Sequence, residues 1–459
     1  MPRHLRVTLA AALSFAMAAS APAAEKAEQK KPFFPYPMKV ETLPNGLTVV
    51  RVPFASNGMI AYYSAVRTGS RNEVEQGHTG FAHFFEHMMF KGTKKHPTGE
   101  REKILGELGF DDNAYTSDDC TVYHSFGPAG GLEKLIEVEA DRFSGLDYGE
   151  PTFQTEAKAI LGEYHKNAAR PELKMEEALN AAAFKKHTYS HTTLGFYDDI
   201  KAMPGKYEYS KSFFQRWYRP DNVIVYIVGE FDDAKTMALV KAAYGPWQGK
   251  AAQVEIPKEP AQAASLKVGL DWDTPTLSRH VHAWRTPAAS LTTLDGQVQT
   301  VLASYLVGPT SPVYKELVLE KQLAEQVGPL YNDHRDPYLF AIAAQLKDEQ
   351  HRAAVEAAFD REVKALASGK VDAKRVTDIR ANLRYSFLMG LETADDIGNV
   401  LAFYGAVLGT PDALDGYYRR MDEVQPSHLV QFAKKYLTDQ NRTVLTLKSK
   451  AAAAQPEGK

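Results

Sequence analysis

Residues 80–90 of this 459-residue chain read GFAHFFEHMMF, which places three ionisable side chains among large apolar ones. On a helix, His83 and His87 are four residues apart and project from one face, where two imidazoles can bind the same metal ion. Glu86 lies beside His87 and can accept a proton from a water molecule that the ion activates. Burying these groups without a metal would be unfavourable. The stretch therefore predicts a helical metal site with Glu86 as the catalytic base.

A catalytic zinc ion usually has a third protein ligand and one open position for water. The helix expected after Pro151 carries Glu156 and Glu163, which are about two turns apart and share one face. One carboxylate can bind the ion, and the other can orient a histidine from behind. Two alternatives stay open at this level: the carboxylates can form a solvated acidic face, and the histidines can be hydrogen-bonded core residues.

The order His-x-x-Glu-His is the inverse of the commoner zinc-hydrolase pattern. Followed by Glu163, with Glu156 seven positions before it, the motif resembles the pitrilysin-type (M16) zinc metallopeptidases. This resemblance implies one Zn²⁺ per chain, held by His83, His87 and Glu163. It also implies Glu86 as catalytic base and Glu156 as a supporting catalytic carboxylate.

A second segment, Asn113-Ala114-Tyr115, is similar to the strand that binds extended substrate in that family. The physical basis is β-augmentation, in which an edge strand offers main-chain hydrogen bonds to any extended peptide. A plain structural strand is the alternative for this segment. The resemblance covers nearly the whole chain after the first residues and is strongest from Pro44 to Asp232.

The chain departs from the family in its second half. Single-chain members usually carry an arginine and a tyrosine seven positions apart that hold the substrate carbonyl, and no such pair occurs after residue 265. Oxyanion stabilisation of this kind is commonly a few kcal/mol. We therefore expect the zinc-bearing subunit of a bacterial heterodimeric member, whose homologous partner subunit supplies the Arg/Tyr pair.

The fold expected is α+β, with two similar domains that each consist of a mainly antiparallel sheet packed with helices. A Pro-, Ala- and Lys-rich stretch marks the linker between them, and the element order is similar on both sides, as in a duplication. The predicted divisions are an N-terminal zinc-binding catalytic domain (36–247), a linker (248–265), a C-terminal homologous domain without a metal site (266–449) and a disordered tail (450–459).

The first residues predict export. Arg3 and Arg6 precede an apolar run and then small residues up to position 24, the pattern of a secretory signal peptide (1–24), so a periplasmic or secreted location is expected. No later stretch is apolar and long enough to span a membrane. Cys120 is the only cysteine, which excludes an intrachain disulfide and a cysteine-rich metal site. The net charge of −3 gives no sign of nucleic-acid binding.

Together these features predict a zinc-dependent endopeptidase that cleaves peptides or small unfolded proteins. The alternatives are a non-catalytic assembly or peptide-binding subunit of a peptidase complex, and a zinc hydrolase that acts on other substrates. A structural zinc site is disfavoured because such sites are normally closed by four Cys or His ligands. Two histidines and a glutamate would also accept manganese or cobalt.

Overall fold

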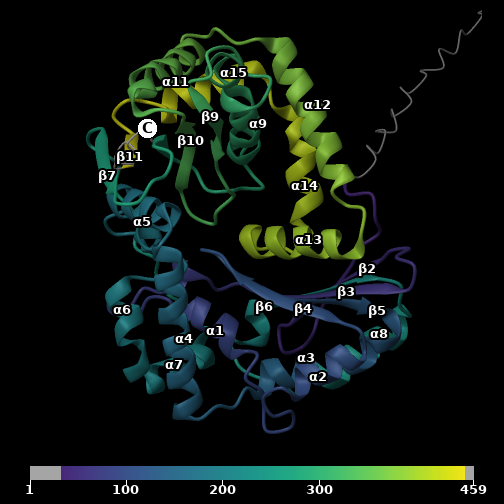
Figure 1. Ribbon diagram of the computed structural model, residues 1–459. Helices are drawn as coiled ribbons and strands as arrows, with labels where there is room; N and C mark the ends of the chain where they lie inside the picture. The colour runs from purple at the N-terminus through teal and green to yellow at the C-terminus, as the bar shows by residue number, and fades with distance from the viewer. Residues whose placement is uncertain (1–32, 450–459) are drawn as a thin grey trace, which may run out of the picture. The chain divides into compact units, whose positions relative to one another are not determined.

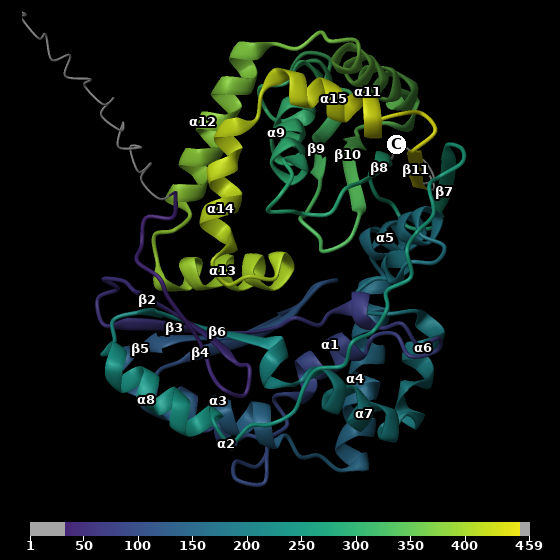
Figure 2. The same ribbon diagram turned by 180° about the vertical axis from the view of Figure 1, so that it is seen from behind.

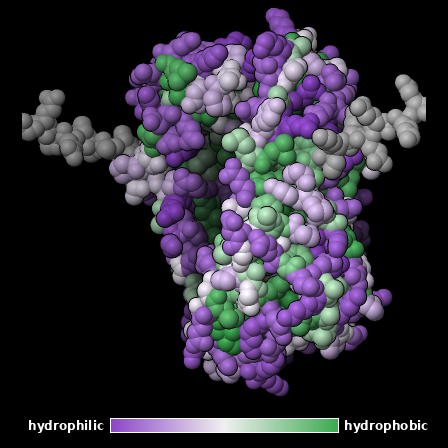
Figure 3. Space-filling model, turned by 90° about the vertical axis from the view of Figure 1, so that its right-hand side faces the viewer, coloured by the Kyte–Doolittle hydropathy of each residue, from purple (hydrophilic) through white to green (hydrophobic). Residues whose placement is uncertain are grey.

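The computed structural model describes residues 33–449, and the sequence predictions for residues 1–24 and 450–459 lie outside them. These described residues form two β-sheets packed with helices (Figure 1), which confirms the predicted fold class. Residues 246–265 between the two sheets contain no helix or strand. Within residues 33–449, no helix is both long enough and apolar enough to cross a membrane. On the face drawn in Figure 3, hydrophobic patches alternate with larger hydrophilic areas, and a hollow opens between them.

The first sheet has the strand order β1-β2-β6-β3-β5-β4. All neighbouring strands are antiparallel except β2 and β6. Its first hairpin turns at Gly46, whose φ of +99° favours glycine. The strands are β1 (Lys39–Thr42), β2 (Thr48–Pro53), β3 (Met59–Val66), β4 (Asp111–Thr116), β5 (Thr121–Pro128) and β6 (Val223–Gly229).

Helices of the N-terminal half cover one face of this sheet, where Tyr62, Val225 and Ile227 join their apolar side chains in one core. The helices of this half are α1 (Phe81–Met88), α2 (Glu100–Glu107), α3 (Leu132–Gly145), α4 (Glu150–Ala168), α5 (Pro171–Ala183), α6 (Tyr197–Ala202), α7 (Tyr207–Trp217) and α8 (Asp233–Tyr244).

The second sheet repeats the topology of the first. Its order is β7-β11-β8-β10-β9, and only the pair β7 and β11 is parallel, so each strand matches one in the series β2-β6-β3-β5-β4. The strands are β7 (Leu266–Trp272), β8 (Arg279–Thr286), β9 (Ala324–Leu330), β10 (Tyr338–Leu346) and β11 (Arg442–Ser449). The shared connectivity supports the duplication that the element order indicated.

The helices of the C-terminal half are α9 (Asp295–Val307), α10 (Pro312–Tyr314), α11 (Arg352–Ala367), α12 (Ala373–Met389), α13 (Ala394–Leu408), α14 (Ala413–Arg419) and α15 (Pro426–Tyr436). Helices α9, α11 and α15 pack on one face of the second sheet.

Each sheet receives a helix from the other half on its remaining face (Figures 1 and 2). Helix α13 packs Ile397 and Leu401 against the first sheet, beside Tyr63 and Tyr226. The C-terminal end of α5 and the residues after it pack against Val281 and the rest of the second sheet. Strand β6 is consequently buried along its whole length, as its unbroken apolar sequence VIVYIVG indicates.

Candidate metal centre

Helix α1 is held in place at both its N-terminus and its apolar face. The Glu73 carboxylate accepts hydrogen bonds from the backbone N–H groups of Gly80 and Ala82, each at 2.7 Å, and so occupies the positive end of the helix. Gly80 has a φ of +87°, and a Cβ there would collide with Ile200. The phenylalanines of α1 are buried. Helix α1 is therefore held in a fixed position, and so are the backbone positions of His83, Glu86 and His87.

Helix α4 brings Glu163 to the two histidines. Its Oε2 atom lies 3.6 Å from Nε2 of His83 and 3.4 Å from Nε2 of His87. The three ligand atoms all lie within 4.8 Å of one another. Two ligands of a tetrahedral zinc ion, each at 2.0–2.1 Å, are about 3.3 Å apart. This donor set, two imidazole nitrogens and a carboxylate oxygen, therefore fits a zinc ion.

Glu156 lies behind His87, on the side away from Glu163. Its Oε1 atom is 2.9 Å from Nδ1 of His87, and its Oε2 atom accepts a hydrogen bond of 2.6 Å from Nζ of Lys91. Burial raises the pKa of Glu156, but the bonds from His87 and Lys91 outweigh it and lower the pKa overall. An ionised carboxylate at Nδ1 fixes the ring orientation and leaves Nε2 free to bind an ion.

The two imidazoles have different proton affinities. Burial lowers the pKa of His83 to about 4. Burial also acts to lower the pKa of His87, but its hydrogen bonds to Glu156 and Glu163 prevail and raise it to about 9. In the absence of a metal, His87 is therefore protonated at neutral pH, and a metal ion must displace this proton to bind.

Glu86 faces the same space as the donor set. Its Oε2 atom accepts a 2.6 Å hydrogen bond from Oγ1 of Thr116, the last residue of β4, and burial raises its pKa. A cavity of about 520 Å³ is lined by His83, Glu86 and Glu163 together with Thr116 and Arg170. A carboxylate beside the donor set, open to a cavity, is placed to exchange a proton with a bound molecule.

Asn113, Ala114 and Tyr115 lie on β4, the last strand in the order of the first sheet. Along residues 113–115, β4 pairs with β5, opposite His124, Tyr123 and Val122. No other described strand pairs with β4, so its outer edge is free to add a peptide strand. Because Thr116 contacts Glu86, this edge ends next to the cavity.

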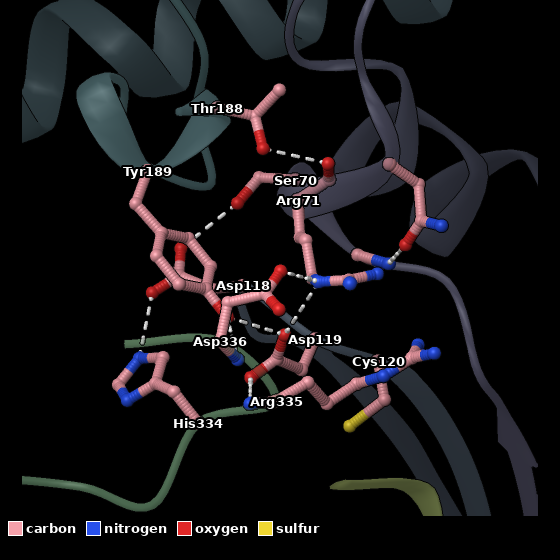
Figure 4. A network of polar contacts seen from close by, with 12 residues as sticks. Ser70, Arg71, Asp118, Asp119, Cys120, Thr188, Tyr189, His334, Arg335 and Asp336 are labelled. Atoms are coloured by element: carbon pink, nitrogen blue, oxygen red, sulfur yellow. Dashed lines mark hydrogen bonds and ion pairs between the residues drawn. The ribbon is translucent and has the colours of Figure 1, made fainter. Parts of the chain in front are cut away.

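The turn after β4 is held by a polar network that joins the two halves (Figure 4). Asp119 accepts hydrogen bonds from the Tyr189 hydroxyl at 2.8 Å and from the backbone N–H of Arg335 at 2.9 Å. Asp118 is 3.0 Å from Nε2 of His334. Nε of Arg71 donates to Asp336 at 2.5 Å. The network fixes the β4–β5 turn, and with it the strand beside Glu86.

The structure brings His83, Glu86, His87, Glu156 and Glu163 together, and Tyr115 lines the same cavity, whereas Asn113 and Ala114 lie on β4 and do not line it. It also adds residues that the sequence did not reveal. The first is Thr116, which contacts Glu86. The second is Lys91, which contacts Glu156. The third is Glu73, which contacts the N-terminus of α1. Lys91 lies beyond the end of α1 at Met88, so its contact with Glu156 does not follow from helical spacing. Thr116 and Glu73 have no local signal either, because their partners are defined by the tertiary fold.

Comparison with known proteins gives first the class and then the family. The protein-family model described as "Insulinase (Peptidase family M16)" matches residues 62–195 of the sequence. A second protein-family model, described as "Peptidase M16 inactive domain", matches residues 206–383. Both models describe parts of peptidases. The chain belongs to the M16 peptidase family.

Similar proteins agree with this assignment. The zinc protease PqqE of Helicobacter pylori is 29% identical over 89% of this chain and 92% of its own length. A probable mitochondrial-processing peptidase subunit beta of Arabidopsis thaliana is 26% identical over 88% of this chain and 77% of its own length. The crystal structure of a protease from Helicobacter pylori has a TM-score of 0.83 and 28% identity, covering 90% of this chain and all (100%) of that chain.

Proposed function

We propose that this chain is the zinc-bearing subunit of a heterodimeric endopeptidase that cleaves peptides or small unfolded proteins. The observation that carries this proposal is the convergence of His83, His87 and Glu163 from two helices, with Glu86 beside them at a cavity. When bound by these three residues, zinc supplies Lewis acidity, which lowers the pKa of water and polarises a carbonyl group.

The protein's own residues supply the proton transfers and the alignment. Glu86 accepts a proton from the attacking water and returns it to the leaving amine. Thr116 holds the Glu86 carboxylate in position, and Glu156 does the same for the His87 ring. The free edge of β4, at Asn113, Ala114 and Tyr115, binds the substrate as an added strand. This mode of binding selects extended peptides over folded proteins.

The proposed partner is a homologous subunit. No arginine with a tyrosine seven positions later follows residue 265, so this chain lacks the carbonyl clamp that the family resemblance implies. One relative is, by its name, a subunit beta of a processing peptidase. We place the complex in the periplasm or outside the cell on the signal-peptide pattern of residues 1–24.

The test is peptide cleavage by the purified chain, alone and with a candidate partner encoded by a neighbouring gene. Glu86→Gln is expected to lower kcat/KM by about 10²–10⁴-fold while the zinc content stays unchanged. Glu107→Gln, an exposed glutamate on α2, is the matched control and should cleave normally.

Three outcomes separate the parts of the proposal. Unchanged cleavage by Glu86→Gln would refute the role of the base. Full activity of the chain alone, with no gain from any partner, would refute the heterodimer. Peptide binding without cleavage by the wild-type pair would favour the non-catalytic peptide-binding alternative.

A further inference from the structure

A second cluster of metal-binding side chains lies in the C-terminal half. His280 and His282 are two residues apart on β8 and therefore point to the same face of the second sheet. Both are completely buried, and their Nε2 atoms are 3.0 Å apart. Glu356 of α11 faces them, and one ligand atom from each of the three residues lies within 4.8 Å of the other two.

The hydrogen bonding of the two histidines is incomplete. Neither Nδ1 atom has a hydrogen-bond partner. Their two Nε2 atoms are within hydrogen-bond distance of each other, so one of them donates a proton and the other accepts it through its lone pair. Two neutral imidazoles that share one Nε2–Nε2 hydrogen bond leave one Nδ1–H donor and one Nδ1 acceptor without a partner. Each such buried group costs about 1–3 kcal/mol, which makes the pair a poor structural element by itself.

The carboxylates around the pair are arranged as at a metal site. Among the described residues, none donates a hydrogen bond to the Glu356 carboxylate. One turn later on α11, Oδ1 of Asp360 lies 3.8 Å from Nδ1 of His282, on the far side of that ring and beyond hydrogen-bond distance. The nearby cations are paired, Arg352 with Glu349 and Arg442 with Asp360.

We propose that His280, His282 and Glu356 bind a second divalent transition-metal ion of the zinc type, with a structural role. Their Nε2 separation of 3.0 Å is close to the roughly 3.3 Å between two ligands of a tetrahedral zinc ion. The ion would take the lone pairs of both Nε2 atoms and replace the single hydrogen bond between them, so that both Nδ1 atoms would carry the protons and that of His282 would face Asp360. It would also fasten α11 to the second sheet. This proposal departs from the sequence prediction that residues 266–449 have no metal site, and it does not depend on the proposed peptidase function.

The experiment measures cobalt bound per chain. The full-length protein is stripped with a chelator, loaded with Co²⁺, desalted and analysed by mass spectrometry for metal and by absorption for coordination geometry. We expect two equivalents for the wild type and one for the double variant His83→Gln/His87→Gln. Adding Glu356→Gln to this double variant should weaken the remaining site by about tenfold or more.

The matched control is Glu362→Gln in the same double variant, because Glu362 lies on α11 but outside the cluster, and it should keep the remaining equivalent. Glu356 is only partly buried, so its replacement should leave the fold intact, which circular dichroism can verify. A second readout is the melting temperature of the double variant, which Co²⁺ should raise only when Glu356 is present.

Two results would overturn the second site: no cobalt bound by His83→Gln/His87→Gln, or a bound equivalent that Glu356→Gln leaves unchanged. The first of these results, with one equivalent in the wild type, leaves the proposed peptidase centre intact. If instead the wild type binds a single equivalent that Glu356→Gln removes, the second site stands and the metal ligands assigned to the peptidase are wrong.

Discussion

The two clusters of histidine and glutamate offer the same ligands in different surroundings. At the first, the His87 and Glu163 side chains are 28% and 34% exposed, and Glu86 stands beside them at a cavity. At the second, His280 and His282 are 0% exposed. The comparison shows that two imidazoles and a carboxylate are sufficient ligands for a metal ion. Access for a substrate and a neighbouring base decide whether such a site can catalyse a reaction.

The largest effect we expect comes from the buried charges that support the first cluster. Glu139 on α3 pairs with Arg101 at 2.7 Å and with Arg142, and Arg101 also binds Asp112 at the start of β4. Glu139→Gln should lower the free energy of unfolding by about 3–5 kcal/mol, because it leaves two buried guanidinium groups without a full counter-charge. Urea unfolding measures this change.

Glu137→Gln is the control for this variant, since Glu137 lies on the same helix but has a side chain that is 41% exposed and pairs with two lysines. The Glu137→Gln variant should lower the free energy of unfolding by less than about 1 kcal/mol. Equal effects of the two variants would show that the buried network does not stabilise this half more than a surface ion pair does.

The next effect concerns the connection between the halves that contain the two clusters. Burial acts to lower the pKa of His334, but its bond to Asp118 raises it overall. A histidine with a raised pKa contributes its full stability below its ordinary pKa, about 6.5, and loses that contribution as the pH rises through the raised value.

His334→Gln should therefore lower the free energy of unfolding by about 1.5–3 kcal/mol at pH 6, and the gap to the wild type should shrink towards pH 9. Chemical unfolding of both proteins over this pH range measures the gap. A gap that stays constant with pH would mean that the charge on His334 does not contribute.

A third test concerns the carboxylate behind the first cluster. Glu156→Gln should weaken zinc binding there by about 10–100-fold, because the ring of His87 loses its charged partner. Competition with a chromogenic chelator measures the affinity. Glu150→Gln, at the exposed start of the same helix, should bind zinc as the wild type does. Unchanged affinity in Glu156→Gln would make Glu156 a structural residue only.

The smallest effect is expected at the second cluster. In metal-free protein, His280→Leu/His282→Leu should lower the free energy of unfolding by no more than about 1 kcal/mol, because it removes two incompletely hydrogen-bonded groups together. The same variant should lose any stabilisation by Co²⁺. A loss of several kcal/mol without metal would show that the histidine pair stabilises the fold by itself.

The sequence predicted those features of the structure that depend on residues close together in the chain. Helical spacing placed His83 with His87, and Glu156 with Glu163, on common faces. The Asn-Gly pair at residues 45 and 46 is a local pattern of the same kind, and it lies in the turn between β1 and β2. The sequence could not predict Thr116 beside Glu86, since Thr116 comes thirty residues later in the chain, after α2 and at the end of β4. Nor did it single out His280 and His282, because alternate residues of any strand share a face and the spacing carries no metal signature.

The sequence indicates that a strand is covered on both faces, but it does not indicate which helices cover it. The unbroken apolar run of β6 indicates a strand buried on both faces, but not which segment supplies the second layer. That layer is α13, which follows β6 by more than 160 residues. Such pairings depend on long-range packing, and a single sequence contains no local pattern for them.

The exchange of α5 and α13 between the halves has a consequence for how the protein can be divided. Expressed alone, residues 33–247 would present Tyr63, Tyr226 and the rest of that sheet face to water, while residues 266–449 would carry α13 with nothing to cover. Proteolytic cleavage within residues 248–265 should thus yield a nicked protein whose fragments stay associated until denatured. The connecting segment can be severed without separating the cores that it joins.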